Sequence, residues 1–133
     1  MYAMRKELHQ YRQAGPIAEA AVADPHRLIQ MLFEGALERI AVARGAMEHG
    51  NIRVKGEKLG QAITIIDGLR SMLDHSQGGE LATNLDALYE YMTRRLAQGN
   101  ARNDLEALDE VIRLLREIKS GWDGIPEMLR RAS

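Results

Sequence analysis

The chain contains four stretches in which apolar residues recur every three or four positions, and this spacing constrains the fold more than any other feature. It places the apolar side chains on one face of an α-helix. Because the breaks between the stretches are short, neighbouring helices must run antiparallel. The sequence therefore predicts an all-α fold, an antiparallel up-down four-helix bundle, with helices over residues 25–49, 52–74, 80–98 and 105–122.

The predicted helix starts carry residues that suit that position. Asp24 precedes Pro25 at the start of the first helix. An aspartate side chain accepts hydrogen bonds from the first free N–H groups of a helix, and a proline in the first turn needs no acceptor. Asn51 and Asp104 stand in the same place before the second and fourth helices.

The predicted helix ends rest mainly on glycine. We expect Gly50 to end the first helix and Gly99-Asn100 to end the third, because glycine readily takes the left-handed conformation that closes a helix. Residues 75–79 contain two glycines, and we expect them to form a flexible connection. Three glycines inside the second helix either lower its helicity or let a neighbouring helix approach closely: Gly56, Gly60 and Gly68.

The two ends of the chain lack this clear spacing. Gly15-Pro16 interrupts residues 1–24 and is typical of a turn or loop. We expect an N-terminal arm or short extra helix over 1–24, the bundle over 25–122 and a short C-terminal tail over 123–133, in a single domain. A domain of this size buries roughly two-thirds of its unfolded surface, which is enough for a core without disulfides.

Composition and charge argue against several classes of protein. Lys and Arg number 18 against 19 Asp and Glu, so the chain lacks a basic field and we expect no nucleic-acid partner. No apolar run approaches the roughly 20 residues of a membrane-spanning helix, and residues 1–12 lack the apolar core of a signal peptide. The absence of cysteine suits a reducing compartment, so we expect a cytoplasmic protein without membrane insertion.

Residue types that catalyse reactions or bind metals occur without the spacing that this chemistry requires. The histidines form no His-x-x-x-His or Glu-x-x-His pair, so we expect no metal site and place all of them on the solvated surface: His9, His26, His49 and His75. No histidine has the mid-helix setting of a phosphotransfer bundle, and no phosphate-binding glycine loop occurs. We predict a protein that is not an enzyme and holds no cofactor. A ferritin-like metalloprotein is the alternative that metal analysis would test.

A surplus of apolar residues remains after the core is accounted for. In the first helix, residues 28–33 are apolar except for Gln30, whereas an amphipathic helix of a small bundle hides a stripe only about 100° to 140° wide. The extra residues either widen the core, meet the N-terminal arm or line a groove for an amphipathic partner helix. Seven methionines favour the groove, because flexible thioethers adapt to varied partners.

Several ordered segments resemble a known protein family. Residues 11–13 read YRQ, residues 23–37 read ADPHRLIQMLFEGAL, residues 84–92 read NLDALYEYM and residues 103–112 read NDLEALDEVI. In this order and over almost the whole chain, they resemble the flagellar secretion chaperone FliS family. Residues 23–37 are the most specific of these segments.

The resemblance implies a cytosolic export chaperone. Such a protein would bind the disordered C-terminal segment of flagellin through apolar grooves, prevent premature polymerisation and hand flagellin to the flagellar type III export apparatus. The resemblance also suggests contacts with the export gate and with regulators of flagellar assembly. The alternative is a helical-bundle adaptor or regulatory protein without a flagellin client. Whether the free chain forms a homodimer through the same apolar face stays open.

The resemblance and the apolar pattern together select candidate partner-binding residues. They lie in the N-terminal arm and on the first three helices: Tyr11, Ile17, Leu28, Met31, Leu32, Ile65, Met72, Leu85, Tyr89 and Met92.

Overall fold

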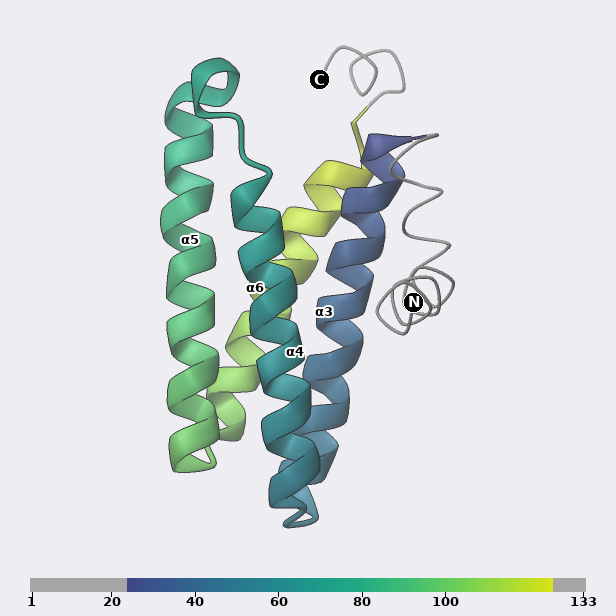
Figure 1. Ribbon diagram of the computed structural model, residues 1–133, viewed down its shortest axis with the longest axis vertical. Helices are drawn as coiled ribbons and strands as arrows, with labels where there is room; N and C mark the ends of the chain where they lie inside the picture. The colour runs from purple at the N-terminus through teal and green to yellow at the C-terminus, as the bar shows by residue number, and fades with distance from the viewer. Residues whose placement is uncertain (1–23, 126–133) are drawn as a thin grey trace, which may run out of the picture.

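The computed structural model describes residues 24–125 and consists there of four helices without strands (Figure 1). They are α3 (Pro25–Glu48), α4 (Ile52–Ser71), α5 (His75–Arg102) and α6 (Leu105–Asp123). Successive helices run in opposite directions, so the expected antiparallel four-helix bundle is confirmed. The arm expected over 1–24 and the tail expected over 123–133 lie almost wholly outside the described residues.

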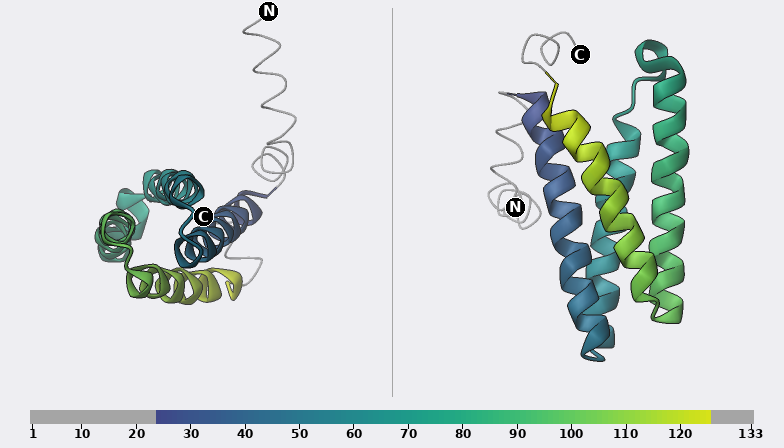
Figure 2. Two further views of the ribbon diagram at one scale, coloured as in Figure 1. Left: turned by 90° about the horizontal axis from the view of Figure 1, so that it is seen from below. Right: turned by 180° about the vertical axis from the view of Figure 1, so that it is seen from behind.

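The helices form a ring in chain order. Each helix packs against the next, and α6 closes the ring by packing against α3. Figure 2 shows that α6 crosses the bundle obliquely. It begins beside the C-terminal end of α5 and finishes beside the N-terminal end of α3, so it leans away from the N-terminal half of α5.

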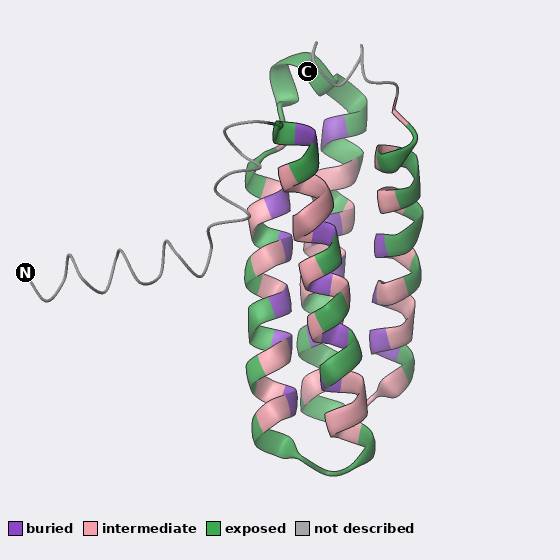
Figure 3. Cartoon of the chain, turned by 90° about the vertical axis from the view of Figure 1, so that its right-hand side faces the viewer, coloured by how far each residue is buried: buried purple, intermediate pink, exposed green. Residues whose placement is uncertain are grey.

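The core follows the predicted helical stripes. Buried residues, purple in Figure 3, recur along each helix at intervals of three or four positions. The largest side chains that are almost completely buried come from all four helices: Phe33, Ile40, Leu59, Ile66, Met92, Leu96, Leu108, Val111 and Leu115. Since burying one such side chain contributes about 1.5–3 kcal/mol, these stripes supply most of the drive for the helices to pack.

The expected helix caps are present. The side chain of Asp24 accepts a hydrogen bond from the His26 N–H at 3.1 Å, and that of Asn51 accepts one from the Val54 N–H at 3.2 Å. Asp104 caps α6 in the same way. At the end of α3, Gly50 takes a φ of +72°, the left-handed conformation for which glycine is suited.

The start of α5 differs from the prediction. Residues 75–79 are not a flexible connection, because Asp74 accepts hydrogen bonds from the Ser76 and Gln77 N–H groups and starts a helical turn at His75. Gly79 then interrupts the helix with φ +52° and ψ −124°, a conformation that favours glycine. The helix before this connection is also shorter than expected, since α4 ends at Ser71 rather than at residue 74.

The end of α5 was also predicted wrongly. Gly99-Asn100 does not end the helix, which continues to Arg102 and is closed by Asn103 in the left-handed conformation, with φ +51°. Gly99 is buried against the start of α6, where an added Cβ would lie 2.8 Å from Leu108 Cδ1. This glycine therefore serves close helix packing. The three glycines of α4 do not, because a Cβ on any of them would meet nothing within 4 Å.

The expectation that every histidine is solvated is wrong for His26. Its ring is buried and stacks on the Trp122 ring at a centroid distance of 4.6 Å. His26 Nε2 donates to the Trp122 carbonyl at 2.7 Å, and Trp122 Nε1 donates to the His26 carbonyl at 3.0 Å. His49 and His75 are exposed, as expected, and His9 lies outside the described residues.

Candidate protein-binding surface

Partly buried apolar residues lie along α3 and α4 where these helices meet, and two of them, Leu32 and Ile65, also pack against the core. Leu28, Met31 and Leu32 share a helix face with Gly35, since they are spaced by three or four positions. At Gly35 that face meets α4, because an added Cβ would lie 3.5 Å from Ile65 Cδ1. The two helices are antiparallel, so residues before Gly35 lie beside residues after Ile65.

Apolar side chains are also exposed where the end of α4 meets the start of α5. Met72, just after α4, is 46% exposed, and it follows Arg70, whose Nε donates to Asp86 Oδ1 on α5 at 2.7 Å. This ion pair sets the N-terminal part of α5 beside the end of α4. Two leucines there, Leu81 and Leu85, stand one helical turn apart on one face. We name the whole set the α3–α4–α5 surface: Leu28, Met31, Leu32, Ile65, Met72, Leu81 and Leu85.

Leu81 has an identifiable reason for its exposure. The sequence pattern places it on the inward stripe of α5, in line with Leu85 and with the buried Tyr89. In the structure Leu81 is 66% exposed, because the last turns of α6 lean toward α3 and leave this part of α5 uncovered (Figure 2). Sequence reasoning missed it as a surface residue, since helix tilt leaves no signal in the spacing.

Two of the candidate residues lie in the core instead. Tyr89 is almost fully buried and Met92 completely so. Burial raises the pKa of the Tyr89 hydroxyl to about 12, so the ring stays neutral. We therefore leave both out of the α3–α4–α5 surface. Tyr11 and Ile17 lie outside the described residues.

Ion pairs border the α3–α4–α5 surface without giving it a net charge. Arg27 contacts Glu34 at 3.2 Å on α3, and Arg70 contacts Asp86 between α4 and α5. The hydrogen bond from Arg70 lowers the pKa of the Asp86 carboxyl. A partner would therefore meet mainly apolar side chains with a polar edge, the arrangement typical of protein interfaces.

Metal-binding clusters and membrane-spanning helices are absent from the part of the chain that the structure describes. Residues 24–125 contain no group of three or more His, Asp or Glu side chains placed to hold a metal ion. No helix in this range is long and apolar enough to cross a membrane.

Comparison with known proteins identifies the family. The model of the family "Flagellar protein FliS" matches residues 7–128. Flagellar secretion chaperone FliSB of Pseudomonas aeruginosa is 58% identical over 94% of this chain and 98% of that protein. Flagellar secretion chaperone FliS of Vibrio cholerae is 47% identical over 92% of this chain and 90% of its own length. The Salmonella typhimurium protein of the same name is 48% identical over 86% of each chain. The chain described here therefore belongs to the FliS family, whose similar members are named flagellar secretion chaperones.

Proposed function

We propose that this chain is a cytoplasmic flagellar export chaperone that binds the disordered C-terminal segment of flagellin. It would keep that segment from polymerising prematurely and hand it to the flagellar type III export apparatus. Membership of the FliS family supports the chaperone role. The observation that supports binding of an extended client is the α3–α4–α5 surface, a set of partly or fully exposed apolar side chains at the same end of three helices.

The surface suits a segment that becomes helical as it binds. An amphipathic helix recognises a groove through apolar anchors spaced by three, four and seven residues, and apolar side chains spaced in this way line α3. A disordered client loses conformational entropy when it binds, which reduces affinity relative to the interface area. This lower affinity would allow the export apparatus to remove the client from the chaperone.

Calorimetric titration of the purified chain with a peptide from the C-terminal segment of the host's flagellin tests the proposal. We expect saturable one-to-one binding with a negative heat-capacity change, the mark of buried apolar surface. In a parallel pull-down, flagellin that lacks this segment should not be retained. Equal retention of complete and truncated flagellin would refute binding through the C-terminal segment.

Two variants test whether the α3–α4–α5 surface contacts the flagellin segment. Met72→Glu and Leu81→Glu each place a charge where a client would bury an apolar side chain, and each should weaken peptide binding at least tenfold, or about 1.4 kcal/mol. Val42→Glu is the matched control, because Val42 is 43% exposed, close to the 46% of Met72, and lies outside this surface. An equal loss of binding in all three variants would contradict the assignment.

The same proteins distinguish the alternative, an adaptor of flagellar assembly without a flagellin client. A stable complex with the export gate or an assembly regulator in the absence of flagellin, together with no flagellin binding, would favour that function. Gel filtration of the free chain would show whether it forms the homodimer that the apolar surface allows.

A further inference from the structure

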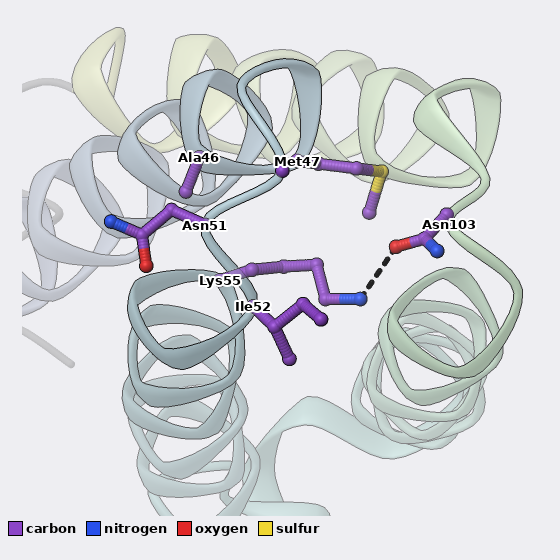
Figure 4. Close-up of a pocket in the computed structure, with 7 residues that line it drawn as sticks. Ala46, Met47, Asn51, Ile52, Lys55 and Asn103 are labelled. Carbon is purple, nitrogen blue, oxygen red and sulfur yellow. Dashed lines mark hydrogen bonds between the residues drawn. The ribbon is translucent and has the colours of Figure 1, made fainter.

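A pocket opens at the end of the bundle opposite the α3–α4–α5 surface. It lies between the α3–α4 turn and the residue that closes α5, and its volume is about 260 Å³ (Figure 4). A single water molecule needs only about 15 Å³ of such space, so the pocket can hold a larger group. Its lining residues come from the end of α3, the turn after it, the start of α4 and the residue that closes α5: Ala46, Met47, Gly50, Asn51, Ile52, Lys55 and Asn103.

The ammonium group of Lys55 forms part of the pocket wall. Lys55 is only 6% exposed, and its Nζ donates to Asn103 Oδ1 at 2.6 Å and to the Asn100 carbonyl at 2.9 Å (Figure 4). Both acceptors are neutral. An ammonium group has three N–H donors, and within residues 24–125 the third has no acceptor and no carboxylate pairs with Lys55.

This arrangement is unusual for a cation. Lysine is rarely buried unless it is paired, because removing an ammonium from water costs several kcal/mol. The carbonyls at the C-terminal end of α5 and the negative end of its dipole offset part of that cost. An anion inside the pocket would accept a further hydrogen bond from the ammonium group and bring a negative charge to it.

The pocket wall indicates which anion fits. A single cation balances a single negative charge, which favours a carboxylate over a phosphate group. The remaining wall is largely aliphatic, with Ala46 and Met47 inside and Ile52, 75% exposed, beside Lys55 (Figure 4). A small free carboxylate such as acetate has little apolar surface with which to cover this aliphatic wall. A peptide that carries an acidic residue next to an aliphatic one can pair with Lys55 and cover the wall as well.

We propose that this pocket is a docking site for a carboxylate-bearing peptide segment of a protein partner. A glutamate or aspartate side chain of the partner binds the Lys55 ammonium, and a neighbouring aliphatic side chain covers Ile52. The site lies at the other end of the bundle from the α3–α4–α5 surface, so it does not depend on the flagellin proposal.

A titration followed by NMR tests this site on the full chain. The probe is a short peptide with blocked ends that contains leucine next to glutamate, and the matched peptide carries glutamine instead. We expect the glutamate peptide to shift the backbone amide signals of Asn51, Ile52, Lys55 and Asn103 saturably in the millimolar range. The glutamine peptide should bind at least tenfold more weakly. Equal binding of the two peptides, or no shift, would overturn the proposal.

Variants and a small anion complete the test. Lys55→Met keeps the length of the side chain and removes its charge, and it should abolish the shifts. Lys58→Met, one turn along α4, should leave them unchanged. Because Lys55→Met also removes hydrogen bonds at the end of α5, Ile52→Ser provides a second variant that should weaken binding several-fold in a folded chain. If acetate binds as tightly as the glutamate peptide, the aliphatic contact is refuted.

Discussion

At the scale of single residues, the contact between His26 and Trp122 joins the first turn of α3 to the last turn of α6. Each residue donates a hydrogen bond to the other's carbonyl, and the rings stack between these bonds. Gln30 Nε2 adds a hydrogen bond to Asp123 Oδ1 at 2.7 Å one turn further along α3. Together these contacts hold the oblique end of α6 against α3, away from α5.

His26→Ala should therefore destabilise the fold. The change removes the ring stack and one hydrogen bond, and it leaves the Trp122 carbonyl without this donor, so we expect a loss of about 1–3 kcal/mol in the free energy of unfolding. Urea unfolding followed by circular dichroism measures it. His75→Ala, at an exposed histidine, should stay within about 0.5 kcal/mol of the unchanged chain. Equal stability of the two variants would contradict a structural role for His26.

At the scale of helices, glycine has opposite effects in α4 and α5. A glycine inside a helix ordinarily costs about 0.5–1 kcal/mol relative to alanine. Gly60 is exposed and has free space around it, so it bears that cost without a packing benefit. Gly99 is buried where α5 approaches α6, and an added Cβ would lie 3.1 Å from Ala107 Cβ as well as close to Leu108.

Alanine substitutions at these two glycines should shift stability in opposite directions. Gly60→Ala should raise the free energy of unfolding by about 0.5–1 kcal/mol, because it adds helix propensity in open space. Gly99→Ala should lower it by about 1–3 kcal/mol, because the start of α6 must move. Thermal and urea unfolding of the two variants measure both changes. Stabilisation by Gly99→Ala would show that α5 and α6 are less closely packed than described.

The sequence predicted the helices better than their ends. Periodicity revealed all four helices and most core residues, and the polar caps at Asp24, Asn51 and Asp104 marked three starts correctly. It failed at Gly99, since the sequence does not distinguish a glycine that ends a helix from one that admits a neighbour. It also failed at His26, because burial there depends on Trp122, which is distant along the chain.

At the scale of the whole molecule, the tilt of α6 determines which apolar residues are exposed. Residue spacing gives the direction that each side chain takes from its own helix, but not the angle at which two helices cross. The sequence indicated a surplus of apolar residues and selected Leu28, Met31 and Met72 as candidate partner-binding residues. It placed Leu81 inside because the crossing angle of α6 could not be predicted from the spacing. It gave no sign of the Lys55 pocket, which forms only when two distant turns meet.

Ion pairs between adjacent helices brace the same ring. Arg44 of α3 donates to Asp109 of α6 at 2.6 Å, and Arg70 of α4 pairs with Asp86 of α5. A third carboxylate, Glu110 of α6, accepts from two residues of α5, the Tyr91 hydroxyl at 2.7 Å and Arg95 Nε at 2.8 Å. These hydrogen bonds lower the pKa values of the three carboxyl groups below their ordinary values of 3.8 for aspartate and 4.5 for glutamate.

The bundle should consequently lose stability in acid. A carboxyl group whose pKa is lower in the folded chain stabilises the fold above its unfolded pKa, and this contribution disappears as pH falls through the folded value. The melting temperature should therefore hold from pH 7 to about pH 5 and fall below about pH 4. Asp109→Asn, which removes one such group, should lower the melting temperature at pH 7 and reduce its fall in acid. Glu57→Gln, which changes a carboxylate paired only within α4, is the control. A melting temperature that is unchanged between pH 7 and pH 3, or an Asp109→Asn profile parallel to that of the unchanged chain, would show that these pairs do not brace the ring.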